Sequence, residues 1–222
     1  MKRNAPIFAR IIAPILFGAL LAACASGPRP PDWQANAKGA LDASVDDYLK
    51  GHTAAAAAQF REARAETAAT GRPDHVAQVE LVRCAAQAAS LVFDDCPGYA
   101  ALASDATPAQ RAYAAYLAGR WDTVDVALLP EQHRPVIGGG ALDKLADPLA
   151  RLVAAGARFK AGRMTPQDIA LAVDTASDQG WRRPLLTWLG VQEQRATGAG
   201  DTAAAEAIRR RMALVSGERK PE

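Results

Sequence analysis

From Asp32 onward the sequence repeats one local pattern: an alanine-rich stretch with apolar residues three or four positions apart, ended by glycine or proline. Alanine has the highest intrinsic helix propensity. β-Branched residues, which favour strands, are sparse and scattered. Glycine, proline and capping residues separate the stretches and mark where helices end. The pattern therefore predicts an all-α fold in which almost every segment between these breaks is a helix.

Strong start signals place several of these helices. Thr107-Pro108 and Thr165-Pro166 each put a capping residue before a proline at the first helical position, and Asp147-Pro148 predicts a kink or a fresh start. Irregular structure is expected around Cys96-Pro97-Gly98 and a flexible hinge at Gly138-Gly139-Gly140. The expected helices cover 32–50, 53–70, 74–91, 107–119, 142–162, 165–180, 184–197 and 201–215, with one or two turns at 121–129 and irregular structure at 92–107.

Apolar periodicity distinguishes the second and third of these helices. The second has one apolar stripe, which includes Ala56 and Phe60, so one face is expected to be buried. The third is apolar on two faces, one containing Val79 and Val82 and the other Leu81 and Ala85. A helix that is apolar on two faces packs on both sides, so the third helix is predicted to lie near the centre of the domain.

Residues 1–23 have the layout of a secretory signal segment. Basic side chains at Lys2, Arg3 and Arg10 flank the apolar run 11–20, which is too short to span a bilayer. Small residues then lead directly into Cys24. The alternative interpretation is an ordinary secreted protein in which this cysteine stands by chance.

The run Leu21-Ala22-Ala23-Cys24 resembles the lipobox of bacterial lipoproteins. The resemblance implies cleavage before Cys24, diacylation of its thiol and acylation of the new amino group, which together form a firm membrane anchor. Residues 24–31 then serve as the lipidated cysteine and a short proline-containing tether. Ala25, where lipoproteins retained in the inner membrane carry Asp, implies an outer-membrane location.

Removal of residues 1–23 leaves 199 residues, which we expect to form a single α-helical repeat-like domain over 32–215 and a frayed tail over 216–222. The signal segment holds three of the 26 basic residues and no acidic ones, so the mature chain has 23 basic and 24 acidic side chains. This near-neutral balance argues against nucleic acid as a partner and against strong attraction to an anionic lipid surface.

Cys84 and Cys96 are the two cysteines that follow Cys24. Because an envelope compartment is oxidising, a disulfide between Cys84 and Cys96 is the leading prediction. Two inert thiols are the main alternative. A catalytic thiol would need a histidine partner, and the proximity of His75 in sequence is the only support for one.

Glycine-containing turns recur between the expected helices. Tyr48-Leu49-Lys50-Gly51 is followed by an alanine and a bulky residue at Ala56 and Phe60, and Tyr116-Leu117-Ala118-Gly119 is a second turn of the same kind, 68 residues later. These spacings resemble the tetratricopeptide repeat. The resemblance implies an array of antiparallel helical hairpins in a tetratricopeptide-like superhelix. An irregular helical bundle is the alternative.

No familiar catalytic or metal-binding motif stands out. His52, His75 and His133 share no ligand spacing and are expected at surface turns, and Gly138-Gly139-Gly140 has no Lys-Ser or Lys-Thr after it, as a phosphate loop requires. The pairs Asp46-Asp47 and Asp94-Asp95 are typical of helix surfaces and ends. The sequence therefore predicts a protein that is not an enzyme and that uses no cofactor or metal.

Three aromatic residues remain as candidate binding residues. Tyr113, Tyr116 and Trp121 either fill the core between repeats or line a concave groove, since helical arrays bind peptides on their inner face.

The function we expect is that of an outer-membrane lipoprotein facing the periplasm, which acts as a helical scaffold or adaptor for envelope proteins. It resembles in architecture the lipoproteins that assist pilus, secretin or outer-membrane protein assembly. The alternatives are a peptidoglycan-related enzyme or enzyme activator, and a carrier of a small or lipidic ligand.

Overall fold

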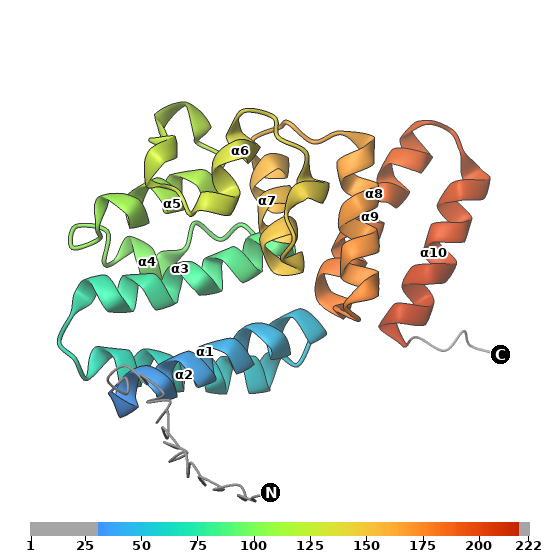
Figure 1. The fold of residues 1–222 in the computed structure, drawn as a ribbon. Helices are drawn as coiled ribbons and strands as arrows, with labels where there is room; N and C mark the ends of the chain where they lie inside the picture. Colours follow the sequence, from blue (N-terminus) through green and yellow to red (C-terminus); the bar gives the residue numbers. More distant parts are fainter. Residues whose placement is uncertain (1–30, 218–222) are drawn as a thin grey trace, which may run out of the picture. The chain divides into compact units, whose positions relative to one another are not determined.

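A computed structural model describes residues 31–217 (Figure 1). The signal segment, Cys24 and residues 25–30 of the tether lie outside these residues, as do residues 218–222 of the expected tail. Within the described range every regular element is an α-helix or a 3-10 turn, so the all-α fold class is confirmed. No helix of this range is apolar enough over a sufficient length to cross a bilayer.

The longer helices follow the expected order along the chain, and the short helices at 97–100 and 134–137 were not predicted. The α-helices are α1 (Asp32–Lys50), α2 (Thr53–Ala68), α3 (Pro73–Ala89), α4 (Pro97–Ala100), α5 (Pro108–Leu117), α6 (Arg134–Ile137), α7 (Pro148–Lys160), α8 (Pro166–Asp178), α9 (Arg182–Gly198) and α10 (Thr202–Ser216). The 3-10 turns are η1 (Trp121–Thr123), η2 (Val126–Leu128), η3 (Glu131–His133) and η4 (Leu142–Lys144).

The predicted start signals form the expected caps. The Thr107 hydroxyl accepts a hydrogen bond from the backbone N–H of Gln110. The backbone N–H of Thr107 donates in turn to the side-chain oxygen of Gln110, and the two bonds form a capping box. Thr165 forms the same arrangement with Asp168 at the start of α8. Asp147 caps α7, so this helix begins afresh after η4, as predicted.

Two segments differ from the expectation of irregular or flexible structure. The segment 92–107 contains the short helix α4. The glycine run at 138–140 is a tight, hydrogen-bonded turn instead of a free hinge. The Gly140 N–H donates to the Pro135 carbonyl at 2.8 Å, and the Gly140 carbonyl accepts from the Arg158 guanidinium at 2.6 Å.

Helices that are neighbours in sequence pack against each other. α1 pairs with α2, α7 with α8, α8 with α9, and α9 with α10, while α3 packs between the α1–α2 hairpin and α7 (Figure 1). α3 is buried on both faces, as the two apolar stripes predict, and it also contacts α4 and α5. The main core therefore forms around α3, α5, α7, α8 and α9.

A second, small core lies between the α1–α2 hairpin and α3. Ala40, Phe60, Ala63 and Val79 form a cluster separate from the main core, with Leu41 packed against it. Arg183 of α9 connects the hairpin to the rest of the domain, because its guanidinium donates to the Tyr48 carbonyl and to the Thr53 hydroxyl, both at 2.7 Å. The hairpin thus contacts α9, which is distant in sequence, as well as α3.

Candidate functional site

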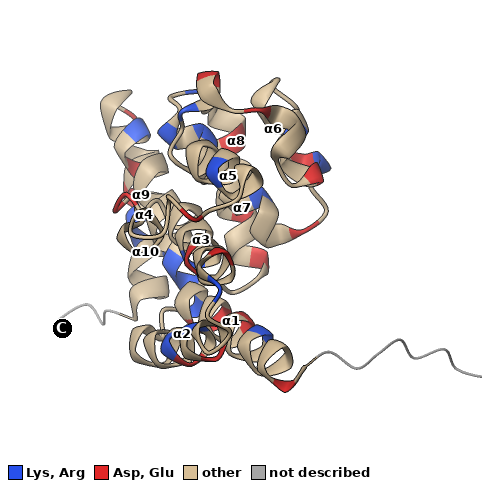
Figure 2. Cartoon of the chain, turned by 90° about the vertical axis from the view of Figure 1, so that its left-hand side faces the viewer, with Lys and Arg blue, Asp and Glu red and all other residues tan. Residues whose placement is uncertain are grey.

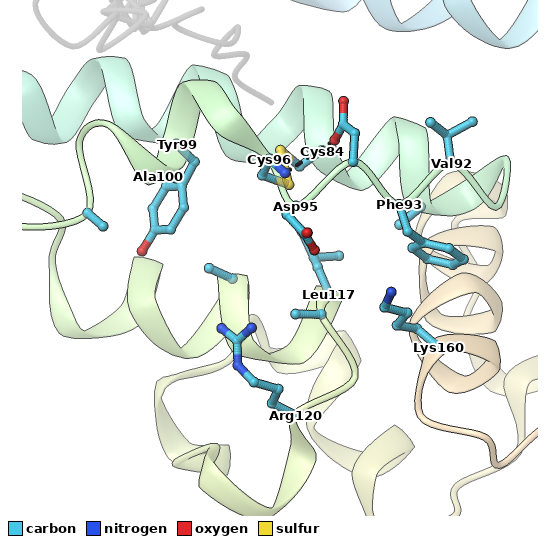
Figure 3. Close-up of a pocket in the computed structure, with 15 residues that line it drawn as sticks. Cys84, Val92, Phe93, Asp95, Cys96, Tyr99, Ala100, Leu117, Arg120 and Lys160 are labelled. Carbon is cyan, nitrogen blue, oxygen red and sulfur yellow. Dashed lines mark hydrogen bonds between the residues drawn. A yellow bond between two sulfur atoms is a disulfide. The ribbon is translucent and has the colours of Figure 1, made fainter.

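A pocket of about 530 Å³ opens between the C-terminal half of α3, the segment that contains α4, helix α5 and the end of α7 (Figure 3). This volume lies in the range of small-ligand sites. The lining is rich in small apolar side chains, and charged side chains surround them. The lining residues are Cys84, Ala88, Val92, Phe93, Asp94, Asp95, Cys96, Tyr99, Ala100, Ala103, Ala114, Leu117, Ala118, Arg120 and Lys160.

The predicted disulfide forms one wall of this pocket. Cys84 of α3 and Cys96 are joined through their sulfur atoms, with their Cα atoms 5.8 Å apart (Figure 3). The bond ties the segment after α3 back onto that helix, which was the expected arrangement. It fixes the position of the chain that carries Asp95, Tyr99 and Ala100 into the pocket.

The backbone of this segment is strained. Leu91, Asp95 and Cys96 have φ angles of 57°, 56° and 50°, in the left-handed region that favours glycine. Each such residue costs on the order of 1–3 kcal/mol, which the surrounding structure must offset. The Cys84–Cys96 bond ends at one of these residues, and α4 follows it directly. Strain of this kind is concentrated at binding sites more often than elsewhere, so its position beside the pocket favours a functional role.

Charges of both signs surround the apolar lining. Asp95, Arg120 and Lys160 extend toward the pocket (Figure 3). None of the ion pairs found among residues 31–217 involves these three side chains. The Lys160 ammonium lies 5.0 Å from the centre of the Phe93 ring, so its cation–π contact leaves its hydrogen-bond donors available to a ligand.

Tyr99 adds a neutral polar group at the edge of the pocket. Its side chain is 8% exposed, and burial raises the pKa of the phenol above its ordinary value, against the opposing charges of Arg111 and Arg120. The hydroxyl therefore stays protonated at neutral pH and can both donate and accept a hydrogen bond. The cavity thus combines a small-residue floor, unpaired charges and a phenol, a composition suited to binding a ligand.

Two of the three aromatic residues predicted as a candidate groove, Tyr116 and Trp121, lie in the core. Tyr116 and Trp121 are 0% and 5% exposed, and their rings stack at 5.7 Å. Tyr113, which is half-buried, stacks on Tyr116 at 6.0 Å. The turns η1 and η2 pack against α5 beside these rings. Tyr113 lines a surface pocket of about 310 Å³ and Trp121 a different one of about 380 Å³, so the three rings do not share one groove. Tyr116 and Trp121 belong to the main core, as the alternative interpretation expects, and Tyr113 packs against it from the surface.

His133 corrects the expectation that the histidines lie at surface turns. It is 2% exposed, and its Nδ1 lies 3.3 Å from the Tyr116 hydroxyl. Desolvation by burial lowers its pKa to about 4, against the weaker opposing effect of Asp147, so the imidazole is neutral at pH 7. His52 is exposed and His75 half-buried, as expected for turn residues.

The two aspartate pairs singled out in the sequence make ordinary polar contacts within the described part of the chain. Asp46 pairs with Lys50 and Asp47 with His52 on the surface, and Asp94 accepts hydrogen bonds from the Gln87 amide and the Cys96 N–H. No cluster of three or more His, Cys, Asp or Glu side chains with metal-binding geometry occurs between residues 31 and 217.

One ion pair in the described part of the chain is buried on both sides and was not predicted from the sequence. Arg158 and Asp168, 6% and 8% exposed, are joined by a hydrogen bond of 3.0 Å. The same Asp168 carboxylate completes the capping box of α8, and the same guanidinium holds the Gly140 carbonyl. Arg158 lies in the last turn of α7, and nothing near it in the sequence indicates that Asp168 will lie opposite.

No family model, curated protein or solved structure matches this chain.

Proposed function

We propose that this chain is an outer-membrane-anchored lipoprotein facing the periplasm, and that its helical domain is a non-enzymatic scaffold or adaptor for an envelope protein. The observation that carries the proposal is the disulfide-walled pocket, with its alanine-rich floor and unpaired charges. The lipobox at Cys24 and the outer-membrane expectation from Ala25 supply the location. Packed helical hairpins, arranged as in a tetratricopeptide-like array, supply the rigid support.

The pocket suits a short segment of a partner protein. A small apolar side chain fits against Ala88, Ala100 and Leu117, while a flanking acidic residue pairs with Arg120 or Lys160. Because the disulfide already holds the strained segment in place, little conformational entropy is lost on binding. A rigid pocket of this kind favours a specific partner over a broad, adaptable surface.

Site-specific photo-crosslinking of the full chain in intact cells tests the adaptor role. A photoreactive amino acid replaces Val92, which lines the pocket and is 39% exposed. The control replaces Ala170, an exposed residue of α8. We expect Val92 to capture one envelope protein that Ala170 does not, and we expect Lys160→Glu to remove that crosslink. Identical crosslinks from both positions, or none from Val92, would overturn the proposal.

Metabolic labelling with an alkyne fatty acid tests the anchor separately. The wild-type chain is expected to incorporate the label and to fractionate with the outer membrane, whereas Cys24→Ser remains unlabelled. Incorporation that persists in Cys24→Ser would contradict the lipobox interpretation.

A further inference from the structure

A second groove, of about 400 Å³, lies between the α1–α2 hairpin and α3, away from the disulfide pocket. Its floor is apolar and is formed by Leu41 and Val45 of α1, Ala56 and Phe60 of α2, and Ala86 of α3. Alanine side chains are too short to fill the space between neighbouring helices, which leaves the groove open. Phe60 belongs both to this lining and to the small core that the hairpin shares with α3.

The groove carries an excess of positive charge. Arg61, Arg64 and Arg83 line it, and Glu80 is the one carboxylate among its described lining residues. Figure 2 shows the basic positions on α2 and α3, the two helices that supply these arginines. Three guanidinium groups opposed by one carboxylate leave two positive charges uncompensated beside an apolar floor.

Two of these arginines already contact a carboxylate of the chain itself, that of Glu80. Arg64 donates to Glu80 Oε1 at 2.8 Å, and the Glu80 side chain is 5% exposed. Arg83 lies 4.0 Å from the other Glu80 oxygen, and its guanidinium sits 4.8 Å above the Phe60 ring. Arg61 takes part in no ion pair or hydrogen bond found among residues 31–217, and it is exposed at the edge of the groove.

From this charge complementarity we infer that the groove binds a single-chain fatty acid. The carboxylate pairs with Arg61 and Arg83, because guanidinium groups recognise carboxylates through paired N–H donors. The alkyl chain lies along Leu41, Val45 and Phe60 and is removed from water there. This ligand site is separate from the pocket proposed to bind a protein, so the two proposals stand or fall independently.

Photolabelling of detergent-free membranes that contain the full chain tests the inference. The probe is dodecanoate carrying a diazirine, and the labelled peptides are identified by mass spectrometry. We expect label on α1, α2 and α3 around residues 41–64 and 80–87. Unlabelled dodecanoate should compete for the site, whereas dodecyltrimethylammonium, which has a similar chain and the opposite charge, should not.

Matched variants separate charge recognition from general lipid contact. Arg61→Gln/Arg83→Gln is expected to weaken labelling at least about tenfold, since each lost charge-assisted hydrogen bond weakens binding substantially. Arg210→Gln/Arg211→Gln removes the same charge from the exposed side of α10 and should leave labelling unchanged. Ala57→Phe, at an exposed lining position, fills the groove without disturbing the core and should abolish the label.

Several results would overturn the inference. These are labelling outside α1–α3, equal competition by the cationic amphiphile, or stronger competition by dodecyl phosphate than by dodecanoate. A photoreactive residue at Ala57 that captures a protein segment would assign the groove to a polypeptide instead.

Discussion

Gly156 of α7 lies directly against the carbonyl oxygen of Ala88 in α3: a Cβ at position 156 would be 2.0 Å from that oxygen. The two backbones can therefore approach only because position 156 has no side chain. Ala88, Gly156 and their neighbours Ala89 and Ala155 are all buried at this crossing. The contact joins the third helix of the chain to the seventh, and it sets the spacing around which the main core packs.

Gly156→Ala is expected to destabilise the fold by about 1–3 kcal/mol, because the new methyl group forces α3 and α7 apart. Gly39→Ala is the matched control, since a Cβ at this exposed position of α1 meets nothing within 4 Å. There the change should stabilise the helix by about 0.5–1 kcal/mol. Urea unfolding followed by circular dichroism measures both effects. Equal stability of the two variants would contradict the close crossing.

The buried pair of Arg158 and Asp168 predicts a large effect from the loss of one partner. Asp168→Asn leaves the guanidinium buried without its counter-charge and should cost about 3–5 kcal/mol. Asp42→Asn provides the comparison, because Asp42 pairs with Lys38 in a bridge whose side chains are 64% and 75% exposed. That substitution should cost less than about 1 kcal/mol. Similar unfolding midpoints for the two variants would show that Arg158 has access to water.

His133 predicts a loss of stability as the pH falls. Its pKa is about 4 in the folded protein and near 6.5 in the unfolded chain, so the unfolded state binds the proton more tightly. The stabilisation by the neutral imidazole is complete above pH 6.5 and decreases between pH 6.5 and 4, by on the order of 3 kcal/mol in total. Stability measured at pH 7.5, 6 and 5 should follow this trend.

Comparison with His133→Asn isolates this contribution from those of the carboxylates. The variant should lose most of the pH dependence between pH 6.5 and 5. If His133→Asn keeps the full slope, the histidine does not titrate as its burial requires.

Removal of the Cys84–Cys96 disulfide is expected to destabilise the protein by about 3 kcal/mol, because the bond closes a short loop and restricts the unfolded chain. Cys84→Ala/Cys96→Ala should also make residues 91–107 more sensitive to proteases, since the strained conformations at Leu91 and Asp95 lose their support. Limited proteolysis and urea unfolding measure the two effects. Unchanged cleavage between α3 and α5 would show that packing alone holds the segment.

The local features of this fold could be predicted from short stretches of sequence. The capping boxes at Thr107 and Thr165 and the fresh start after Asp147 formed as expected, because each depends on residues within one turn. The buried stripe of α2, with Phe60 at its centre, also agrees with the apolar spacing. The spacing of apolar residues along a helix indicates which of its faces is buried, whichever segment covers that face.

The candidate sites could not be predicted in the same way. Nothing in the sequence distinguishes Arg120 and Lys160 from the other basic residues. The packing of the helices brings them to the pocket beside Cys96. Arg61 and Arg83 likewise reach one groove from two helices. His133 follows a proline-containing turn, which is typical of surface residues, yet the segment folds over α5 and buries it.

The sequence by itself thus determined the helical class and the positions of the longer helices, because helix propensity, capping and periodicity act over a few neighbouring residues. The cysteine pair followed from the presence of just two cysteines after Cys24. Tertiary structure decided which helices cross, which charges stay unpaired and which polar side chains lose contact with water. Those outcomes depend on the close fit of side chains from distant segments, as at Gly156 and Ala88, where one missing methyl group lets two helices meet.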